Sequence, residues 1–446
     1  MEKLFGTDGI RGVAGEYPLD YSSVYALGKA LISLLQAKGL EPKVLIGRDT
    51  RESGVWLEEA LFAGIREKKG EAVTAGIIPT SAISFLTKKY SFSAGIVISA
   101  SHNPYHDNGI KVFSSEGMKI SDKWEEQLEK AVSSANKTSQ KEKAEILLHP
   151  AFRRDYVDFL ESQFSPEKLH RNIKVVLDCA NGASFSIAPQ VFSDLGLEVT
   201  TLNNSPDGRN INENCGSLYP QYLSRKVIET QADLGIAFDG DADRAVWVDE
   251  KGNVLNGDHT LFVLSRFMRE KGRLRSNNIV ATTMSNMGLE NALEKLGLKL
   301  IRTQVGDKYV LEEMIKIKAN LGGEQSGHTI FLDDCPTGDG ILTSVKWLEA
   351  MAEFNLPASR LVDDFDEYPQ VLRNVRVRKK TDFNQFPEIV KTIENIKSQL
   401  ETSGRMEVRF SGTEPMARIM IEGKDKTLLE QYCQEMATII HKYLGN

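Results

Sequence analysis

The chain has 446 residues, of which 41% are hydrophobic and 26% are charged, and its formal net charge is −7. This composition predicts a globular protein of about three domains, give or take one, and argues against a dedicated nucleic-acid binder, which usually carries a basic patch. The scattered cysteines, the lack of an apolar signal-peptide core and the lack of a span-length apolar run predict a cytoplasmic protein with no disulfide framework, zinc site or membrane partner.

The same order of elements occurs three times along the chain. KVLIG (43–47) predicts a strand, which a polar loop connects to a helix over about 54–69 and to a second strand ending at Pro79. KVVL (174–177) leads through DCANGAS into a helix and LEVTTL, and IVATT (279–283) leads through MSNMG into LENALEKLG and LKLIRT. Strand, small-residue loop, helix and strand predict β-α-β units on largely parallel sheets with right-handed connections.

The pattern changes after Tyr368-Pro369. Strand-like VLRNVRVRKK, a helix, strand-like MEVRF and ARIMIEG, and a last amphipathic helix predict a small α+β domain of about 75 residues. A charged stretch rich in Ser and Lys (133–143) is expected to be a linker. We therefore expect an α/β protein with three related α/β domains and a small C-terminal α+β domain, with the bounds 1–150, 151–255, 256–370 and 371–446.

The segment AGIVISASHNPYHDNGIKVF (94–113) is the most informative of the chain. An apolar run ends at a polar turn that contains Ser101, and a second strand-like segment then carries one cation, Lys111. A serine at a strand end and a positioned lysine suggest nucleophilic chemistry with a proton-transfer partner. Taken alone, the segment is explained better by a turn capped by Ser101 and a solvated lysine. Three further groups of residues along the chain reverse that interpretation.

Three aspartates at alternate positions follow the apolar run LGIAF: Asp239, Asp241 and Asp243. Acids at the end of a buried strand would repel one another without a counter-ion, so they predict a site for a hard cation. A calcium EF-hand is rejected because its sixth position, which needs glycine, is Arg244. Three carboxylates leave room for water and a phosphate oxygen, which is how Mg²⁺ is usually held.

Two more loops offer polar groups. In GGEQSGH, Glu324, Ser326 and His328 suit sugar hydroxyls, although a tight turn would explain this loop equally well. In RFSGTEP, small polar residues and flanking arginines suit a phosphate, with a polar hairpin as the alternative; its candidate contacts are Arg409, Ser411, Gly412, Thr413 and Arg418. Arg11 in GTDGIRG is a further candidate anion contact.

Together these segments resemble the α-D-phosphohexomutase superfamily. Five motifs match in the same order across nearly the whole chain: FGTDGIRG, ISASHNP, FDGDADR, GGEQSGH and RFSGTEP. MSNMGLE, VGDKYVLEEM and GGEQSGH with TGDGI are typical of the bacterial branch that acts on glucosamine phosphates. The resemblance implies a heart-shaped molecule in which four domains surround a central cleft, and it suggests a homodimer.

The resemblance also implies a role for each candidate. Ser101 carries a phosphoryl group, and Asp239, Asp241 and Asp243 hold one Mg²⁺ per subunit together with that phosphoserine. Lys111 matches the proposed general acid–base, and Glu324 and Ser326 match the sugar-recognition loop. Arg11, His102 and Arg244 line the reaction centre, and the RFSGTEP residues with Arg418 grip the phosphate of the substrate. Two departures, Phe410 and Ala417, lie beside that phosphate loop and remove no phosphate contact.

These roles imply an isomerase that converts glucosamine 6-phosphate to glucosamine 1-phosphate, a precursor of UDP-N-acetylglucosamine and peptidoglycan. The phosphoserine donates to the C1 hydroxyl, and the bisphosphate turns end for end before its 6-phosphate returns to Ser101. Two alternatives stay open at this point: a mutase of mannose or glucose phosphates, and a non-catalytic sugar-phosphate sensor.

Overall fold

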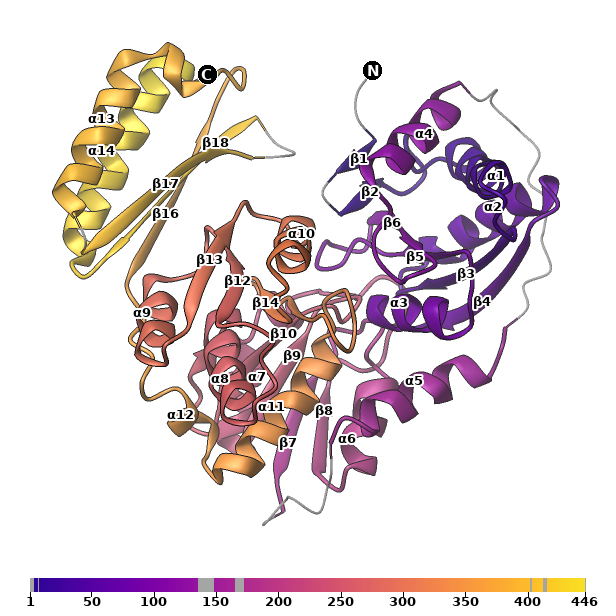
Figure 1. Ribbon diagram of the computed structural model, residues 1–446, viewed down its shortest axis with the longest axis horizontal. Coiled ribbons are helices and arrows are strands. Elements are labelled where there is room, and N and C mark those ends of the chain that lie inside the picture. Colours follow the sequence, from indigo (N-terminus) through magenta and orange to yellow (C-terminus); the bar gives the residue numbers. More distant parts are fainter. Residues whose placement is uncertain are drawn as a thin grey trace.

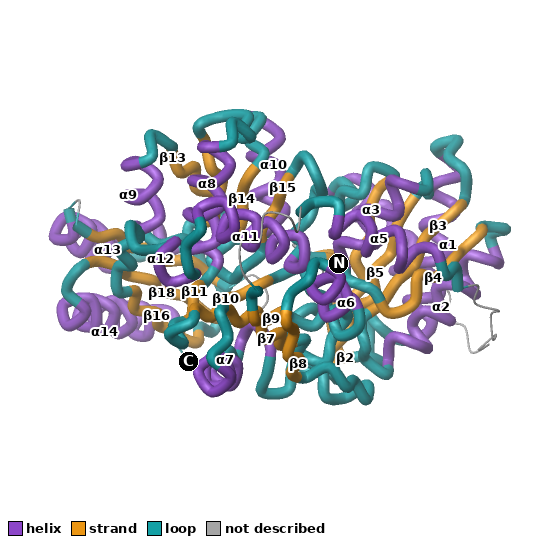
Figure 2. Tube along the Cα trace, turned by 90° about the horizontal axis from the view of Figure 1, so that it is seen from below, coloured by secondary structure: helices purple, strands orange, loops and turns teal. Residues whose placement is uncertain are grey.

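The computed structural model describes residues 4–6, 8–134, 148–164, 172–401, 403–411 and 415–445. Four sheets follow one another along the chain in an arc, and the C-terminal domain stands opposite the N-terminal domain across its open side (Figure 1). Seen from below, the molecule is elongated, with these two domains at its opposite ends (Figure 2). Most of the predicted linker 133–143 lies outside the described residues.

The first sheet has the strand order β1-β2-β6-β5-β3-β4. Its strands are β1 (Phe5–Gly6), β2 (Gly9–Val13), β3 (Lys43–Arg48), β4 (Glu71–Ile77), β5 (Ala94–Ile98) and β6 (Asp107–Ser114). Strands β4, β3 and β5 are parallel, whereas β6 is antiparallel to β5. The helices of this part are α1 (Tyr21–Ala37), α2 (Ser53–Glu67), α3 (Thr80–Lys89) and α4 (Asp122–Ser133).

The second and third sheets have the orders β11-β10-β9-β7-β8 and β13-β12-β14-β15. Their strands are β7 (Lys174–Asp178), β8 (Glu198–Leu202), β9 (Leu234–Phe238), β10 (Ala245–Asp249), β11 (Val254–Leu255), β12 (Asn278–Thr282), β13 (Lys299–Thr303), β14 (Leu321–Gly323) and β15 (Thr329–Phe331). Their helices are α5 (Ala151–Glu161), α6 (Ile187–Asp194), α7 (Gln221–Thr230), α8 (Gly257–Glu270), α9 (Met287–Lys295), α10 (Asp307–Ile317), α11 (Gly340–Phe354) and α12 (Ala358–Leu361).

One topology is repeated in all three of these sheets. In each, the first strand of the unit lies between the second and the third, and the three are parallel; the fourth pairs antiparallel with the third. Helices connect the parallel strands, as the strand–loop–helix–strand pattern predicted. The repeated architecture is therefore confirmed. In each sheet it places the turn between the third and fourth strands at the carboxyl ends of the parallel strands.

One hydrophobic cluster spans the first three domains, each of which also contains a further cluster, and the last domain has a separate one. The large core runs from the first sheet to Phe365, and within it the rings of Trp247 on β10 and Trp347 on α11 stack at 4.6 Å. The separate core lies between β16 (Gln370–Arg376), β17 (Gly404–Phe410), β18 (Met416–Gly423) and the helices α13 (Pro387–Leu400) and α14 (Lys426–Leu444). A domain whose apolar residues pack mainly with one another can move as a unit.

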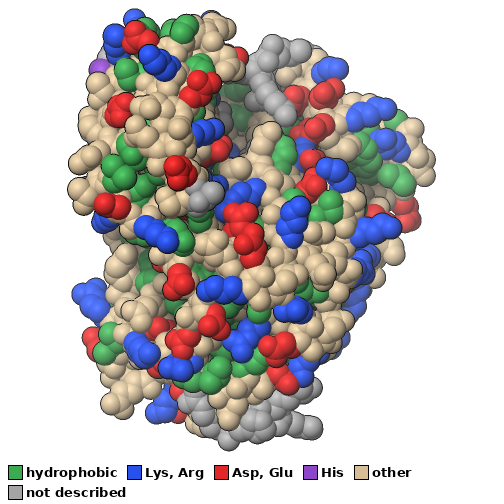
Figure 3. Space-filling view, turned by 60° about the vertical axis from the view of Figure 1, so that its left-hand side comes forward, with side chains coloured by type: hydrophobic (Ala, Val, Ile, Leu, Met, Phe, Trp, Pro, Cys, Tyr) green, Lys and Arg blue, Asp and Glu red, His purple; other side chains and the backbone are tan. Residues whose placement is uncertain are grey.

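Two observations concern membrane-spanning helices and the distribution of charge on the surface. Among the described residues, no helix is long and apolar enough to cross a bilayer. On the face drawn in Figure 3, Lys and Arg side chains lie interspersed with Asp and Glu side chains.

Candidate active site

Three of the predicted functional loops occupy the same place in the repeated topology. The Ser101 loop joins β5 to β6, the aspartate loop joins β9 to β10, and the loop of Glu324 joins β14 to β15. Side-chain contacts join these loops although they lie far apart in sequence: Ser101 reaches Asp239, and the ring of His328 lies 3.8 Å from Asp243. The site thus forms where equivalent turns of three sheets meet.

Ser101 is buried, and its backbone is held in an uncommon conformation. Its φ is +52°, in the left-handed region that non-glycine residues rarely adopt. Its N–H donates to the Ser99 hydroxyl at 2.9 Å, and its own hydroxyl donates to Oδ2 of Asp239 at 2.5 Å. A strained serine aimed at a carboxylate is typical of a functional position, because such strain persists only where the surroundings enforce it.

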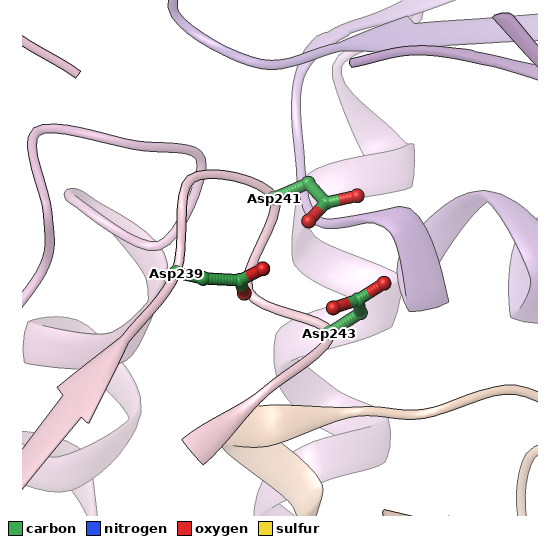
Figure 4. A group of neighbouring side chains, drawn as sticks. All are labelled: Asp239, Asp241 and Asp243. Atoms are coloured by element: carbon green, nitrogen blue, oxygen red, sulfur yellow. The ribbon is translucent and has the colours of Figure 1, made fainter. Parts of the chain in front are cut away.

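The three aspartates converge in the loop between β9 and β10 (Figure 4). All are buried, and one ligand oxygen from each lies within 4.8 Å of the others. Ala242 has a φ of +57°, which turns the loop so that alternate side chains point inward. Oδ1 of Asp241 and Oδ1 of Asp243 are buried and accept no hydrogen bond from the residues described. Buried carboxylate oxygens of this kind fit a hard divalent cation.

The electrostatics of this loop are uneven. Burial, and then the charges of Asp243 and Asp241, raise the pKa of Asp239 well above its usual range. Burial also acts to raise the pKa of Asp243, but the ammonium of Lys111 and the neighbouring His328 and Arg244 outweigh it and hold this pKa well below its usual range. The carboxylate of Asp243 is therefore balanced by nearby positive groups, Lys111 above all, whereas the carboxylate of Asp239 is not.

Lys111 is buried at the centre of the acidic cluster. Its ammonium donates to Asp241 at 2.9 Å and to Asp243 at 3.2 Å, and it lies 3.1 Å from Asp8. Burial acts to lower the pKa of Lys111, but these carboxylates raise it well above its usual range. The solvated-lysine alternative for this residue is wrong.

His102, Arg244 and Arg11 lie around Ser101. Nδ1 of His102 is 3.5 Å from the Ser101 hydroxyl and accepts a hydrogen bond from Arg244 at 3.1 Å. Burial and the positive charges of Arg244 and Arg11 lower the pKa of His102 to about 4, so its ring is neutral near pH 7. Arg11 donates to the Ala100 carbonyl at 2.9 Å and pairs with Asp8. The two arginines place positive charge near Ser101, whereas the His102 ring is neutral.

The residues of the GGEQSGH loop divide into two positions. Glu324 and Ser326 lie at its accessible tip, where the carboxylate of Glu324 accepts from the Gly306 N–H at 3.1 Å. His328 is buried at the base of the loop, where its Nδ1 lies 3.8 Å from Asp243 and its Nε2 lies 3.7 Å from Asp307. Burial acts to lower the pKa of His328, but Asp243 and Asp307 raise it to about 9. The structure therefore places His328 beside the aspartates rather than beside Glu324 and Ser326.

In the C-terminal domain, Arg409 on β17 lies directly opposite Arg418 on β18. Like charges in such a cross-strand pair are destabilising unless an anion lies between them. Burial, and then Arg418, lower the pKa of Arg409 against the opposite effects of Glu407 and Glu324, so the GGEQSGH loop lies within electrostatic reach of Arg409. The pair therefore suits a phosphate.

The remaining candidates of this loop are placed only in part. Ser411 is buried and donates its N–H to the Met416 carbonyl at 2.8 Å, whereas Gly412 and Thr413 lie outside the described residues. The two departures from the family pattern, Phe410 and Ala417, face each other and pack into the separate core of the domain. They therefore point away from the arginine pair.

Sequence reasoning assigned no role to several residues that hold this site. Asp8 contacts Lys111 and accepts from Lys119 at 2.7 Å, and Lys119 also donates to Asp307 at 2.6 Å. Thr80 donates its hydroxyl to Asp241 at 2.6 Å. Asp8 and Asp307 stand inside the motifs FGTDGIRG and VGDKYV, so their presence in a motif was the available signal.

Family models match nearly all of the chain. Phosphoglucomutase/phosphomannomutase alpha/beta/alpha domains I, II and III match residues 2–139, 154–252 and 256–368, and the C-terminal domain of that family matches residues 372–439.

Relatives in sequence and in structure agree with these models. The chain is 46% identical to phosphoglucosamine mutase of Syntrophus aciditrophicus over 100% of both chains, and 45% identical to that of Koribacter versatilis over 100% of this chain and 98% of the relative. A phosphoglucomutase/phosphomannomutase family protein from Burkholderia thailandensis superposes with a TM-score of 0.82 at 24% identity, covering 100% of this chain and 99% of the other. Aspergillus fumigatus N-acetylphosphoglucosamine mutase, solved with GlcNAc-6P and magnesium, gives a TM-score of 0.71 at 18% identity, with coverages of 98% and 95%.

Proposed function

This chain belongs to the phosphoglucomutase/phosphomannomutase family, and we propose that it interconverts glucosamine 6-phosphate and glucosamine 1-phosphate. The observation that carries the chemistry is the 2.5 Å hydrogen bond from the Ser101 hydroxyl to Asp239, one of three buried aspartates that could hold a cation. The choice of sugar rests on the full-length relatives, which are phosphoglucosamine mutases.

The proposed reaction uses Ser101 as the phosphoryl carrier. Asp239, Asp241 and Asp243 would hold one Mg²⁺ together with a phosphoryl oxygen on Ser101, and the ion would neutralise charge that develops on that group. The phosphorus–oxygen bond to Ser101 breaks as a bond to the sugar hydroxyl forms, and that hydroxyl loses its proton. Lys111 is the proposed proton carrier, because its ammonium lies among the aspartates of this site. These carboxylates raise its pKa, and a cation held by Asp241 and Asp243 would oppose that effect, so that Lys111 could take up the proton.

The substrate's own phosphate is proposed to lie between Arg409 and Arg418, with Ser411, Gly412 and Thr413 as further contacts. Glu324 and Ser326 would bind sugar hydroxyls, and His328 would orient Asp243. A bisphosphate can then turn end for end, since a clamp of arginines accepts a phosphate from either end of the sugar. Domain limits near residues 150, 255 and 370 are proposed, with movement of the last domain near Tyr368. The active form is proposed to be a cytoplasmic homodimer phosphorylated on Ser101.

We expect the protein to prefer glucosamine 6-phosphate over glucose 6-phosphate and mannose 6-phosphate. One or two hydrogen bonds to the C2 substituent would supply about 10- to 200-fold in kcat/KM. Product analysis with the three sugars under identical conditions measures this ratio. A ratio below one would assign the chain to mutases of glucose or mannose phosphates.

Arg418→Ala is expected to raise KM for the hexose phosphate by about 10- to 100-fold, because a charged hydrogen bond to phosphate contributes about 1.5–3 kcal/mol. Steady-state kinetics measure the change. Arg373→Ala is the matched control, since Arg373 lies in the same domain and bonds to Gln434 of α14. Equal KM values for the two variants would contradict the phosphate clamp.

A further inference from the structure

The carbonyl groups of the Ser101 loop converge on one buried cation. Arg51 is fully buried, and its five N–H groups all have acceptors: the Asp49 carboxylate and the carbonyls of Ser101, Asn103, Pro104 and Asp107. Nη2 of Arg51 lies 3.0 Å from the carbonyl oxygen of Ser101 and 2.8 Å from that of Asn103. This contact fixes the loop from the side of the first domain.

A side chain of the second domain bonds to two of the same carbonyls. Nδ2 of the buried Asn212 donates to the Ser101 carbonyl at 2.9 Å and to the Asn103 carbonyl at 3.1 Å. Asn212 belongs to the turn-rich segment 203–216, and its own N–H donates to the Ala180 carbonyl at 2.9 Å. The Asp178 carboxylate at the end of β7 accepts from Nδ2 of Asn203 at 3.0 Å and from the N–H of Gly216 at 2.9 Å, so both ends of the segment are fixed.

The aspartate loop touches this arrangement directly. A Cβ on Gly240 would lie 2.6 Å from the Ser101 carbonyl and 2.8 Å from Nδ2 of Asn212. Gly240 follows Asp239, so the position of the Ser101 carbonyl and the position of the Asp239 carboxylate are set by one packed contact.

We propose that Asn212 is a positioning residue that holds the Ser101 loop against the aspartate loop across the boundary of the first two domains. It acts through the Ser101 backbone and touches no substrate. The proposal rests on the proposed role of Ser101 as phosphoryl carrier. It assigns a function to the segment 203–216, because Asn212 in this segment maintains the strained backbone geometry of Ser101.

Asn212→Asp tests the proposal, because it keeps the size of the side chain and places a carboxylate oxygen against two carbonyl oxygens. We expect kcat to fall about 10- to 100-fold, with KM for the hexose phosphate changed by less than about twofold, since misplacement of a reacting group slows chemistry more than it weakens binding. Asn212→Ala, which removes the donor without adding repulsion, should give an intermediate kcat. Asn214→Asp is the matched control, because Asn214 is exposed, shares the left-handed backbone and lies in the same segment.

A second measurement separates this proposal from the choice of substrate. The rate at which Ser101 gains a phosphoryl group from a hexose 1,6-bisphosphate is followed by intact mass. In this step a phosphorus–oxygen bond to Ser101 forms and the one to the sugar breaks, while the Ser101 hydroxyl loses a proton and the sugar oxygen takes one up. This rate should fall in both Asn212 variants and not in Asn214→Asp, whichever monophosphate the wild-type protein prefers. Wild-type kcat and phosphorylation rate in a folded Asn212→Ala protein would overturn the proposal.

Discussion

Ser101→Ala is expected to reduce mutase turnover on the order of 10⁴-fold or more, because the variant has no oxygen to carry the phosphoryl group between substrate and product. The fold should persist, since alanine fits the space of Ser101 and the change removes only the hydrogen bond to Asp239 and the 3.5 Å contact with Nδ1 of His102. Steady-state turnover with glucosamine 6-phosphate measures the loss. Intact-mass spectra should show a phosphoryl adduct on some wild-type molecules and none on the variant.

Ser115→Ala provides the control for this experiment. Ser115 is exposed in the turn after β6 and should retain both turnover and the adduct. Thermal unfolding of both variants distinguishes lost chemistry from lost structure. If folded Ser101→Ala turned over substrate at a wild-type rate, Ser101 would not be the carrier.

The second large effect concerns the aspartate loop. Asp239→Asn and Asp243→Asn should each reduce turnover at least about 100-fold, because charge neutralisation in a partly dry site is lost. In the presence of a chelator, however, the two substitutions should change the free energy of unfolding, relative to the wild-type protein, in opposite directions. The pKa of Asp239 is raised in the folded protein, so its ionisation costs stability as pH rises above about 4, and asparagine removes that cost.

Asp243 has the opposite linkage. Its pKa is lowered in the folded protein, so its ionised form stabilises the fold above pH of about 4, and asparagine removes that contribution. We therefore expect the melting temperature in chelator at pH 7 to rise for Asp239→Asn and to fall for Asp243→Asn. Added Mg²⁺ should stabilise the wild-type protein more than either variant. Shifts of the same sign in both variants would contradict this assignment of charge within the loop.

The sequence predicted the local parts of this protein well, because strands and turns are specified by short patterns. KVLIG forms β3, and the run LGIAF forms β9 and ends at Asp239, as expected. The orientation of Phe410 relative to the arginine pair could also have been predicted from sequence. Successive residues of a strand face opposite sides, so Phe410 and Arg409 had to point apart.

Contacts between distant segments were decided only by the tertiary structure. A motif shows that Lys111 follows Ser101, but not that Asp8, Asp241 and Asp243 surround its ammonium. The segment 203–216 shows only turn residues, and the contact of Asn212 with a carbonyl 111 positions away depends on how two sheets pack.

The sequence by itself determined which side chains stand at the ends of strands, because hydrophobic periodicity and turn chemistry act over a few residues. It also determined the family, through five motifs in a fixed order. The tertiary structure decided which strand ends meet, and it placed His328 beside Asp243 instead of at the tip of its loop. The physical reason is that three sheets of one topology pack through a shared core, and this packing brings equivalent turns to one point.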